Sequence, residues 1–272
     1  MKKEFAFALV TAAFRTVYPK QDFAVERARR WAKQNETAAL FSNFDSDVFF
    51  RKLVLVIFYS GMRANTVSSK KDAVLKCLGD YKKVASFTEE DISRICNEKD
   101  MIRNVAKIRA CIHNAKVFVG LDKQFGSFGK YLLSFNKAFP TDAKHIPELL
   151  IDLQNKFKFL GPRTSRHFIM ECGFPMVKPD RMVMRVLFRL GLIPVESNEC
   201  INEAVKVCLE LAEKAKIPPS FMDSILVGIG QSEGAELCRK YRPICKSCGL
   251  KPYCKYKTNN TRASRRQVSA LK

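Results

Sequence analysis

Long apolar runs, acidic residues and histidine are all scarce in this chain of 272 residues. Its most apolar segment, FFRKLVLVIFYSGM over residues 49–62, is too short to cross a bilayer and carries two charges, which excludes a membrane-spanning helix there. The 27 acidic residues are outnumbered by 48 Lys and Arg, for a formal charge of +21. Such an excess favours an extended polyanion or an anionic membrane surface as partner over a basic soluble protein without one.

The alternation of apolar and polar residues that marks β-strands is also scarce, whereas helical spacing recurs along the chain. The first residues, MKKEFAFALVTAAF, have the lysines and short apolar run of a signal peptide, but Glu4 interrupts the run and favours an amphipathic helix in an intracellular protein. We predict an all-α protein with further helices at 49–59, 88–97, 101–121, 146–158, 164–172, 181–190, 199–214 and 219–229.

The ten cysteines fall into two groups. Six are scattered through apolar segments, as reduced buried thiols are: Cys77, Cys96, Cys111, Cys172, Cys200 and Cys208. The other four lie within residues 238–254, spaced by six, two and five residues with Arg and Lys between them. Four thiolates in one loop suit a 4Fe–4S cluster, and zinc is the alternative. His113 and His167 have no Cys or His at ligand spacing, so no second metal site is predicted.

A tight turn between two helical patterns stands at Leu160-Gly161-Pro162. Gly161 permits an unusual φ, Pro162 fixes the next one, and Thr164 and Ser165 can begin the second helix. The N–H groups at that helix N-terminus could hold a phosphate oxygen, although a plain corner between two helices has the same pattern.

Asp180 follows Pro179 and precedes a helical pattern, MVMRVLFRL. It can cap that helix, and a helix N-terminus also favours a negative charge that faces a developing cation. Cleavage of a sugar–base bond forms such a cation, which a carboxylate can stabilise while water attacks.

The order of these motifs resembles the helix-hairpin-helix base-excision DNA glycosylases over about residues 45–255: an apolar helix, LGPRTS, a second helix, KPDRMVMRVLFRLGL and the cysteine loop. The cysteine spacing is similar to the 4Fe–4S loop of endonuclease III. The resemblance implies an all-α, two-lobed helix-hairpin-helix DNA glycosylase fold with a C-terminal iron–sulfur cluster loop. It implies a monomer that binds duplex DNA containing a damaged or modified base, without a membrane, in the cytoplasm at the nucleoid or in a eukaryotic nucleus.

On this resemblance we expect N-terminal helices at 1–45 that pack on the cluster lobe, and a helical barrel lobe at 46–145 with a DNA-invading loop. The hairpin and the catalytic Asp segment follow at 146–237, the cluster loop at 238–254 and a basic tail at 255–272.

The resemblance also assigns roles to single residues. Asp180 is the catalytic residue, and Met62 is a wedge that fills the gap left by a flipped nucleotide, supported by Arg63, although Met62 also suits a core. The cluster ligands are Cys238, Cys245, Cys248 and Cys254. The expected DNA contacts are Leu160, Gly161, Arg163, Thr164, Ser165, Arg239, Lys240, Arg242, Lys246 and Lys251. The candidates for the base pocket are Tyr59, Phe49, Phe50 and Trp31, all of which also suit core positions.

Some residues depart from the family patterns. Lyase members carry a lysine where Arg163 stands, and since Arg cannot lose its proton, we expect a glycosylase without lyase activity. Segments 101–116, 125–135 and 157–173 look more like the bacterial 3-methyladenine DNA glycosylase I group, which lacks the catalytic aspartate and binds zinc through its termini. The base-reading glutamate and stacking tryptophan of that group fall at Val56 and Ala64.

The sequence therefore predicts that the chain hydrolyses the N-glycosidic bond of an alkylated purine such as 3-methyladenine, by base flipping and Asp-assisted attack of water. One alternative is a glycosylase for uracil, thymine mismatches or another modified pyrimidine. A different class of protein also remains open, namely a catalytically silent iron–sulfur protein that binds DNA.

Overall fold

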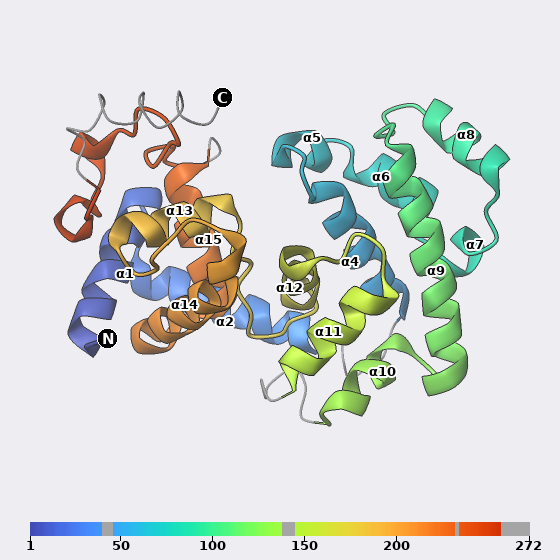
Figure 1. Ribbon diagram of the computed structural model, residues 1–272, viewed down its shortest axis with the longest axis horizontal. Coiled ribbons are helices and arrows are strands. Elements are labelled where there is room, and N and C mark those ends of the chain that lie inside the picture. Colours follow the sequence, from blue (N-terminus) through green and yellow to red (C-terminus); the bar gives the residue numbers. More distant parts are fainter. Residues whose placement is uncertain (40–45, 138–144, 232–233, 257–272) are drawn as a thin grey trace. The chain divides into compact units, whose positions relative to one another are not determined.

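The computed structural model describes residues 1–39, 46–137, 145–231 and 234–256, and in these ranges the chain forms helices without a β-strand (Figure 1). The predicted all-α class is confirmed. No described helix is both long enough and apolar enough to cross a membrane. The expected basic tail at 255–272 lies outside the described residues from residue 257 on.

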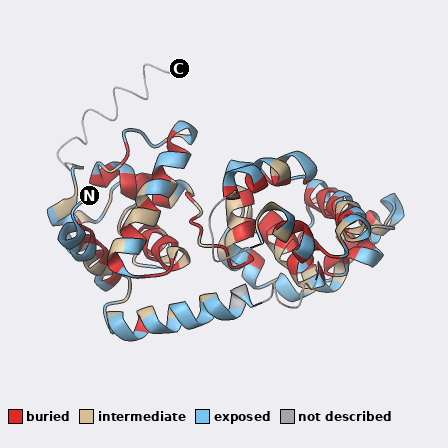
Figure 2. Cartoon of the chain, turned by 90° about the horizontal axis from the view of Figure 1, so that it is seen from below, coloured by how far each residue is buried: buried red, intermediate tan, exposed pale blue. Residues whose placement is uncertain are grey.

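The chain divides into two compact units. Unit 1 comprises residues 1–31 and 177–272, and unit 2 comprises residues 32–176. One division falls within helix α2 (Phe23–Ala38), which is exposed along most of its length (Figure 2). The other falls inside the segment 146–237, so the hairpin at Gly161 belongs to unit 2 and Asp180 belongs to unit 1.

Unit 2 is built around α4 (Ser46–Tyr59) and α9 (Val105–Phe125), which pack against each other. The rings of Phe118 and Phe128 stack with centroids 4.3 Å apart, and Phe50 meets Phe118 edge-on at 5.2 Å. These aromatic contacts fix the helices that carry the turns described below. The helices of unit 2 after α2 are α4 (Ser46–Tyr59), α5 (Ala64–Ser68), α6 (Lys71–Leu78), α7 (Tyr81–Val84), α8 (Glu89–Asn97), α9 (Val105–Phe125), α10 (Phe128–Phe135), α11 (Ile146–Lys156) and α12 (Pro162–Glu171).

Unit 1 joins the N-terminal part of the chain to its C-terminal part. Helix α1 (Lys3–Val17) packs on α14 (Ile201–Ala215) and α15 (Pro219–Gly230). Phe14 of α1 meets Phe221 of α15 edge-on at 6.0 Å. Helix α1 also contacts the cysteine loop, because Thr16 Oγ1 accepts the N–H of Gly249 at 3.2 Å. The elements of unit 1 are α1 (Lys3–Val17), the start of α2, α13 (Arg181–Leu190), α14 (Ile201–Ala215), α15 (Pro219–Gly230) and the short 3₁₀ turns η1 (Asn198–Cys200), η2 (Cys245–Ser247) and η3 (Lys251–Tyr253).

The helices predicted from periodicity are present, and their ends follow from capping. The helix predicted at 181–190 is α13 with the same bounds. The one predicted from residue 101 begins at Val105, because the side chain of Asn104 accepts the N–H of Lys107 at 3.1 Å and so caps the helix there. Thr88 caps α8, and its N–H donates to Asp91 Oδ2 at 3.0 Å.

Candidate functional site

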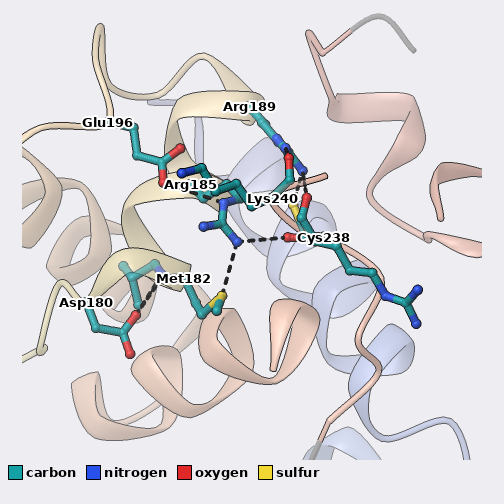
Figure 3. Close-up of polar contacts among 9 residues, drawn as sticks. Asp180, Met182, Arg185, Arg189, Glu196, Cys238 and Lys240 are labelled. Carbon is teal, nitrogen blue, oxygen red and sulfur yellow. Dashed lines mark hydrogen bonds and ion pairs between the residues drawn. The ribbon is translucent and has the colours of Figure 1, made fainter. Parts of the chain in front are cut away.

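Asp180 is the N-cap of α13 in unit 1 (Figure 3). Its Oδ1 accepts the N–H groups of Met182 at 2.8 Å and Val183 at 3.0 Å. Its Oδ2 takes no part in this cap and lies 4.0 Å from Nζ of Lys178, with the side chain 32% exposed. The capping role and a second role for the carboxylate are therefore compatible, since each can use a different oxygen.

Arg189, in the last turn of the same helix, holds the start of the cysteine loop. Its buried guanidinium donates to Cys238 Sγ at 3.2 Å and to the carbonyl oxygens of Arg239 at 2.9 Å and Lys240 at 3.2 Å (Figure 3). The carbonyl of Arg189 in turn accepts the N–H of Lys255 at 2.8 Å. One residue therefore binds the chain at both ends of the loop.

Arg185 lies one turn earlier on α13 and is also buried. Its Nη1 is 3.4 Å from the carbonyl oxygen of Cys238 and 3.4 Å from Met182 Sδ, and its Nε is 3.5 Å from the carboxylate of Glu196. Helix α13 thus has a carboxylate at its start and arginines in contact with the cysteine loop along its length (Figure 3).

The four loop cysteines line one cavity of about 310 Å³, which Arg189 and several apolar side chains also line. Burial raises the pKa of the Cys238 and Cys248 thiols, and the charge of Arg189 opposes the shift at Cys238. Within the ranges given above, no three His, Cys, Asp or Glu side chains form a group able to hold a metal ion as they stand. The donor set and the shared cavity nevertheless suit a group bound by thiolates. The lining cysteines are Cys238, Cys245, Cys248 and Cys254.

The residues between the first and second loop cysteines form an exposed cationic projection. Arg242 adopts a φ of 50°, which is uncommon for a residue other than glycine. Beside it, Tyr241 is 73% exposed, and the Lys240 ammonium lies 5.2 Å from its ring centroid. The predicted phosphate contacts of the loop are all exposed: Arg239, Lys240, Arg242, Lys246 and Lys251.

Met62 lies in the turn that follows α4 in unit 2. Its N–H donates to the carbonyl of Tyr59 at 3.2 Å, and Gly61 between them has a φ of 71°, where a side chain would strain the backbone. The Tyr59 hydroxyl is 2.9 Å from Ser68 Oγ and so ties the end of α4 to α5. Met62 is half-buried and Arg63 is exposed. We call residues 60–63 the Met62 turn.

The predicted hairpin is present between α11 and α12, but Gly161 has an ordinary φ of −83°, and the unusual φ expected of it is found at Phe159. Thr164 Oγ1 accepts the N–H of Gly161 at 2.8 Å and is 2.6 Å from the carbonyl of Phe159, to which it donates. The Thr164 hydroxyl therefore holds the turn. Phe159 has a φ of 63° and is 41% exposed at its tip. Arg163 lies in the first turn of α12, at the positive end of the helix dipole.

Comparison with known proteins places unit 2 in a family. Residues 36–178 match the Methyladenine glycosylase family. The chain belongs to this family. It is 29% identical to a DNA-3-methyladenine glycosylase of Haemophilus influenzae over 145 residues, which are 48% of this chain and 78% of that protein. It is 28% identical to DNA-3-methyladenine glycosylase 1 of Escherichia coli over 144 residues, 47% of this chain and 77% of that protein.

A solved structure of 3-methyladenine DNA glycosylase I from Staphylococcus aureus aligns with a TM-score of 0.43 and 28% identity, over 48% of this chain and 77% of that one. The methyladenine glycosylase match covers nearly all of unit 2 and ends at residue 178. Asp180 and the four loop cysteines lie beyond it, in unit 1.

Four side chains expected at the functional surface of this methyladenine glycosylase are buried in unit 2. Leu160 is 3% and Ser165 0% exposed, so their side chains belong to the core, and their predicted DNA contact stays a prediction for the backbone of the hairpin. Phe49 and Phe50 are both fully buried, since Phe49 packs on Phe128 at 5.4 Å and Phe50 on Phe118. Their assignment to a base pocket is wrong, because their rings complete the aromatic core.

The two other pocket candidates lie in different units. Tyr59 is half-buried beside the Met62 turn. Trp31 is 40% exposed in unit 1, and its indole N–H donates to the carbonyl of Lys216 at 3.2 Å. Their role at a base stays a prediction.

The charged residues that hold the functional turns were not singled out from the sequence. Arg185 and Arg189 stand four residues apart in a helix whose neighbouring positions are apolar, and Lys107 stands before Ile108 on the stripe of α9. These residues could have been identified from the sequence, because each is a single Lys or Arg within the apolar stripe of a helix that faces the core.

Proposed function

We propose that the chain is a monofunctional DNA glycosylase that flips a damaged base out of duplex DNA and hydrolyses its N-glycosidic bond. An alkylated purine such as 3-methyladenine is the first substrate. The observation that carries this proposal is the family match over residues 36–178, supported by relatives named DNA-3-methyladenine glycosylase.

Asp180 is the proposed catalytic residue. Two N–H groups hold Oδ1, so the orientation of the carboxylate is set before substrate binds. Oδ2 then stabilises the sugar cation as the base leaves, or accepts a proton from the attacking water. Arg163 stands where lyase members have lysine and cannot act as an amine nucleophile, so the abasic sugar is left uncleaved.

The proposed grip on DNA uses both units. The start of α12 binds a backbone phosphate through the positive end of the helix and Arg163. Met62 fills the space left by the flipped nucleotide. The exposed cations between the loop cysteines bind further phosphates, which positions the protein without reading sequence.

The four loop cysteines are the proposed ligands of a 4Fe–4S cluster, with zinc as the alternative. Their common cavity and the contact of Arg189 with Cys238 support this. When bound, the group would cross-link residues 238–254 and fix the cationic projection. The chemistry of base release is assigned to Asp180 alone.

The choice of base depends on the residue at position 56 of α4. Val56 is buried on α4 where the 3-methyladenine glycosylase I group has a glutamate, so this chain lacks that carboxylate contact to the base. A base with different polar groups, such as uracil or a mismatched thymine, is therefore the second candidate.

Mass spectrometry of bases released from alkylated, deaminated and oxidised duplex pools tests the proposed function. We expect 3-methyladenine or a related alkylated purine. Release of uracil or thymine alone would move the substrate to pyrimidines. Tight binding of duplex DNA without release of any base would favour the silent DNA-binding protein.

A further inference from the structure

We propose that Lys107 and Asn114, buried on one face of α9, are positioning residues that set the two DNA-contacting turns of unit 2. We call them the α9 pair. This inference rests on the proposed function, because it concerns how the Met62 turn and the hairpin are presented to DNA. Neither residue touches a reacting atom in the proposal.

Lys107 fixes the end of α4. Lys107 is 4% exposed, and its ammonium donates to the carbonyls of Phe58 at 2.8 Å and Ser60 at 2.6 Å. The carbonyl between them, that of Tyr59, accepts the N–H of Met62. The last carbonyls of a helix have no partners within it, so these three bonds determine how the chain leaves α4. A cation at a helix C-terminus is also favoured by the dipole.

The position of Lys107 is costly for an amine without a function. Desolvation lowers the pKa of its ammonium, and the carbonyls of Phe58 and Ser60 are its hydrogen-bond partners. An apolar residue would fill the same space in the core without that cost, but it would leave both carbonyls unbound.

Asn114 fixes the approach to the hairpin in the same way. It is fully buried, its Oδ1 accepts the N–H of Lys158 at 2.8 Å, and its Nδ2 donates to the carbonyl of Lys158 at 3.1 Å. The oxygen and the nitrogen of the Asn114 amide thus both bind the backbone of Lys158, the residue immediately before Phe159 at the tip of the hairpin. The side chain of Asn114 therefore sets the position and orientation of the backbone where it enters the turn.

The two residues are seven positions apart on one helix, which places them on the same face two turns from each other. A single rigid helix therefore fixes both turns, and the distance between the two turns is set by α9. Each residue should affect its own turn: Lys107 the insertion of Met62, and Asn114 the phosphate grip of the hairpin.

Binding to matched duplexes tests this division. The probes are an undamaged duplex and the same duplex with one abasic-site analogue, and the readout is the affinity for each by fluorescence anisotropy. The variants are Lys107→Met, Asn114→Leu and Met62→Ala. Lys116→Met is the control, because Lys116 is exposed on the same helix and the change removes the same charge.

We expect Lys107→Met to lower the preference for the abasic duplex by about tenfold, a size typical of coupled sites, and Lys116→Met to leave it unchanged. Adding Met62→Ala to Lys107→Met should lower the preference no further, because both act on one turn. Asn114→Leu should weaken both duplexes by the same factor and keep the preference.

Equal loss on both duplexes for Lys107→Met, or effects of Lys107→Met and Met62→Ala that simply multiply, would overturn the inference and leave Lys107 as a stabilising residue. A wild-type protein without preference for the abasic duplex would instead overturn the proposed base flipping, and this inference with it. Thermal melting of each variant confirms that the measurements are made on folded protein.

Discussion

Both units present a projecting turn from a helical body, and both hold it with a buried cation, yet the two arrangements differ. In unit 2, Lys107 donates to two backbone carbonyls at the end of α4, so its contacts with the Met62 turn are made within the chain. In unit 1, Arg189 binds two carbonyls and also Cys238 Sγ, at the edge of a cavity lined by four thiols. The first turn is held by hydrogen bonds within the chain, whereas the second would also be held by the proposed group bound to the thiols.

The family match follows the same division. It covers unit 2, which carries the Met62 turn and the hairpin, and it ends before Asp180 and the cysteines. On the proposed function, the grip on a flipped nucleotide belongs mainly to unit 2, whereas the carboxylate and the cationic projection belong to unit 1. Each of these assignments can be tested by a substitution in one unit that leaves the other unit unchanged.

The largest expected effect is that of Asp180→Asn in unit 1. Asn caps a helix about as well as Asp, so the fold should be kept while the charge is lost. We expect base release to fall by about a hundredfold or more, with duplex affinity unchanged. Single-turnover release and anisotropy measure the two quantities.

The control for this substitution is Asp80→Asn in unit 2. Asp80 caps α7, where its side chain accepts the N–H of Lys83 at 3.0 Å, and has no proposed role in the reaction. Equal rates of base release for Asp180→Asn and the wild type would show that Asp180 is not the catalytic residue.

Arg189→Met should have the next largest effect, on the cysteine loop. Loss of a residue that contacts a metal ligand typically weakens metal binding by about tenfold to a hundredfold. Thiolate-bound iron absorbs broadly at about 400 nm. In the presence of a chelator, we expect this absorption to disappear about tenfold faster in Arg189→Met than in the wild type.

Arg29→Met is the matched control for Arg189→Met. Arg29 is exposed in unit 1, and its partner Glu26 also pairs with Arg30, so the loss is small. If the purified protein is colourless and contains zinc, the four cysteines bind zinc instead of a 4Fe–4S cluster. Equal loss rates in both variants would show that the Arg189 contact does not hold the loop.

The smallest expected effect is that of Arg242→Gln at the cationic projection. Removing one phosphate contact should reduce the slope of log affinity against log salt by about 1. Titrations of duplex binding at several salt concentrations measure the slope. Arg94→Gln is the control, since Arg94 is exposed on α8 in unit 2 and pairs with Asp91. A slope that stays the same for Arg242→Gln would remove the projection from the DNA interface.

Periodicity and capping were sufficient to predict the longer helices, because a stripe such as that of α13 and a cap such as Asp180 act within a few residues. Short helices such as α5 and α7 have too few residues to show a period. Phe49 and Phe50 could not be placed, since a helix that is apolar nearly all round does not reveal which aromatic faces a ligand. Lys107 could not be assigned either, because its partners are backbone carbonyls 47 and 49 residues away.

Unit 1 is closed by segments that are far apart in the chain, and this orders events during synthesis. Helix α1 ends at Val17, but α15, against which it packs, begins only at Pro219. At translation rates of about 5–20 residues per second, α1 waits roughly 10–40 s for that partner. Unit 2 is continuous and can fold during this interval. The newly made chain can therefore complete unit 2, with the Met62 turn and the hairpin, before α15 and the cysteine loop that close unit 1 have been made.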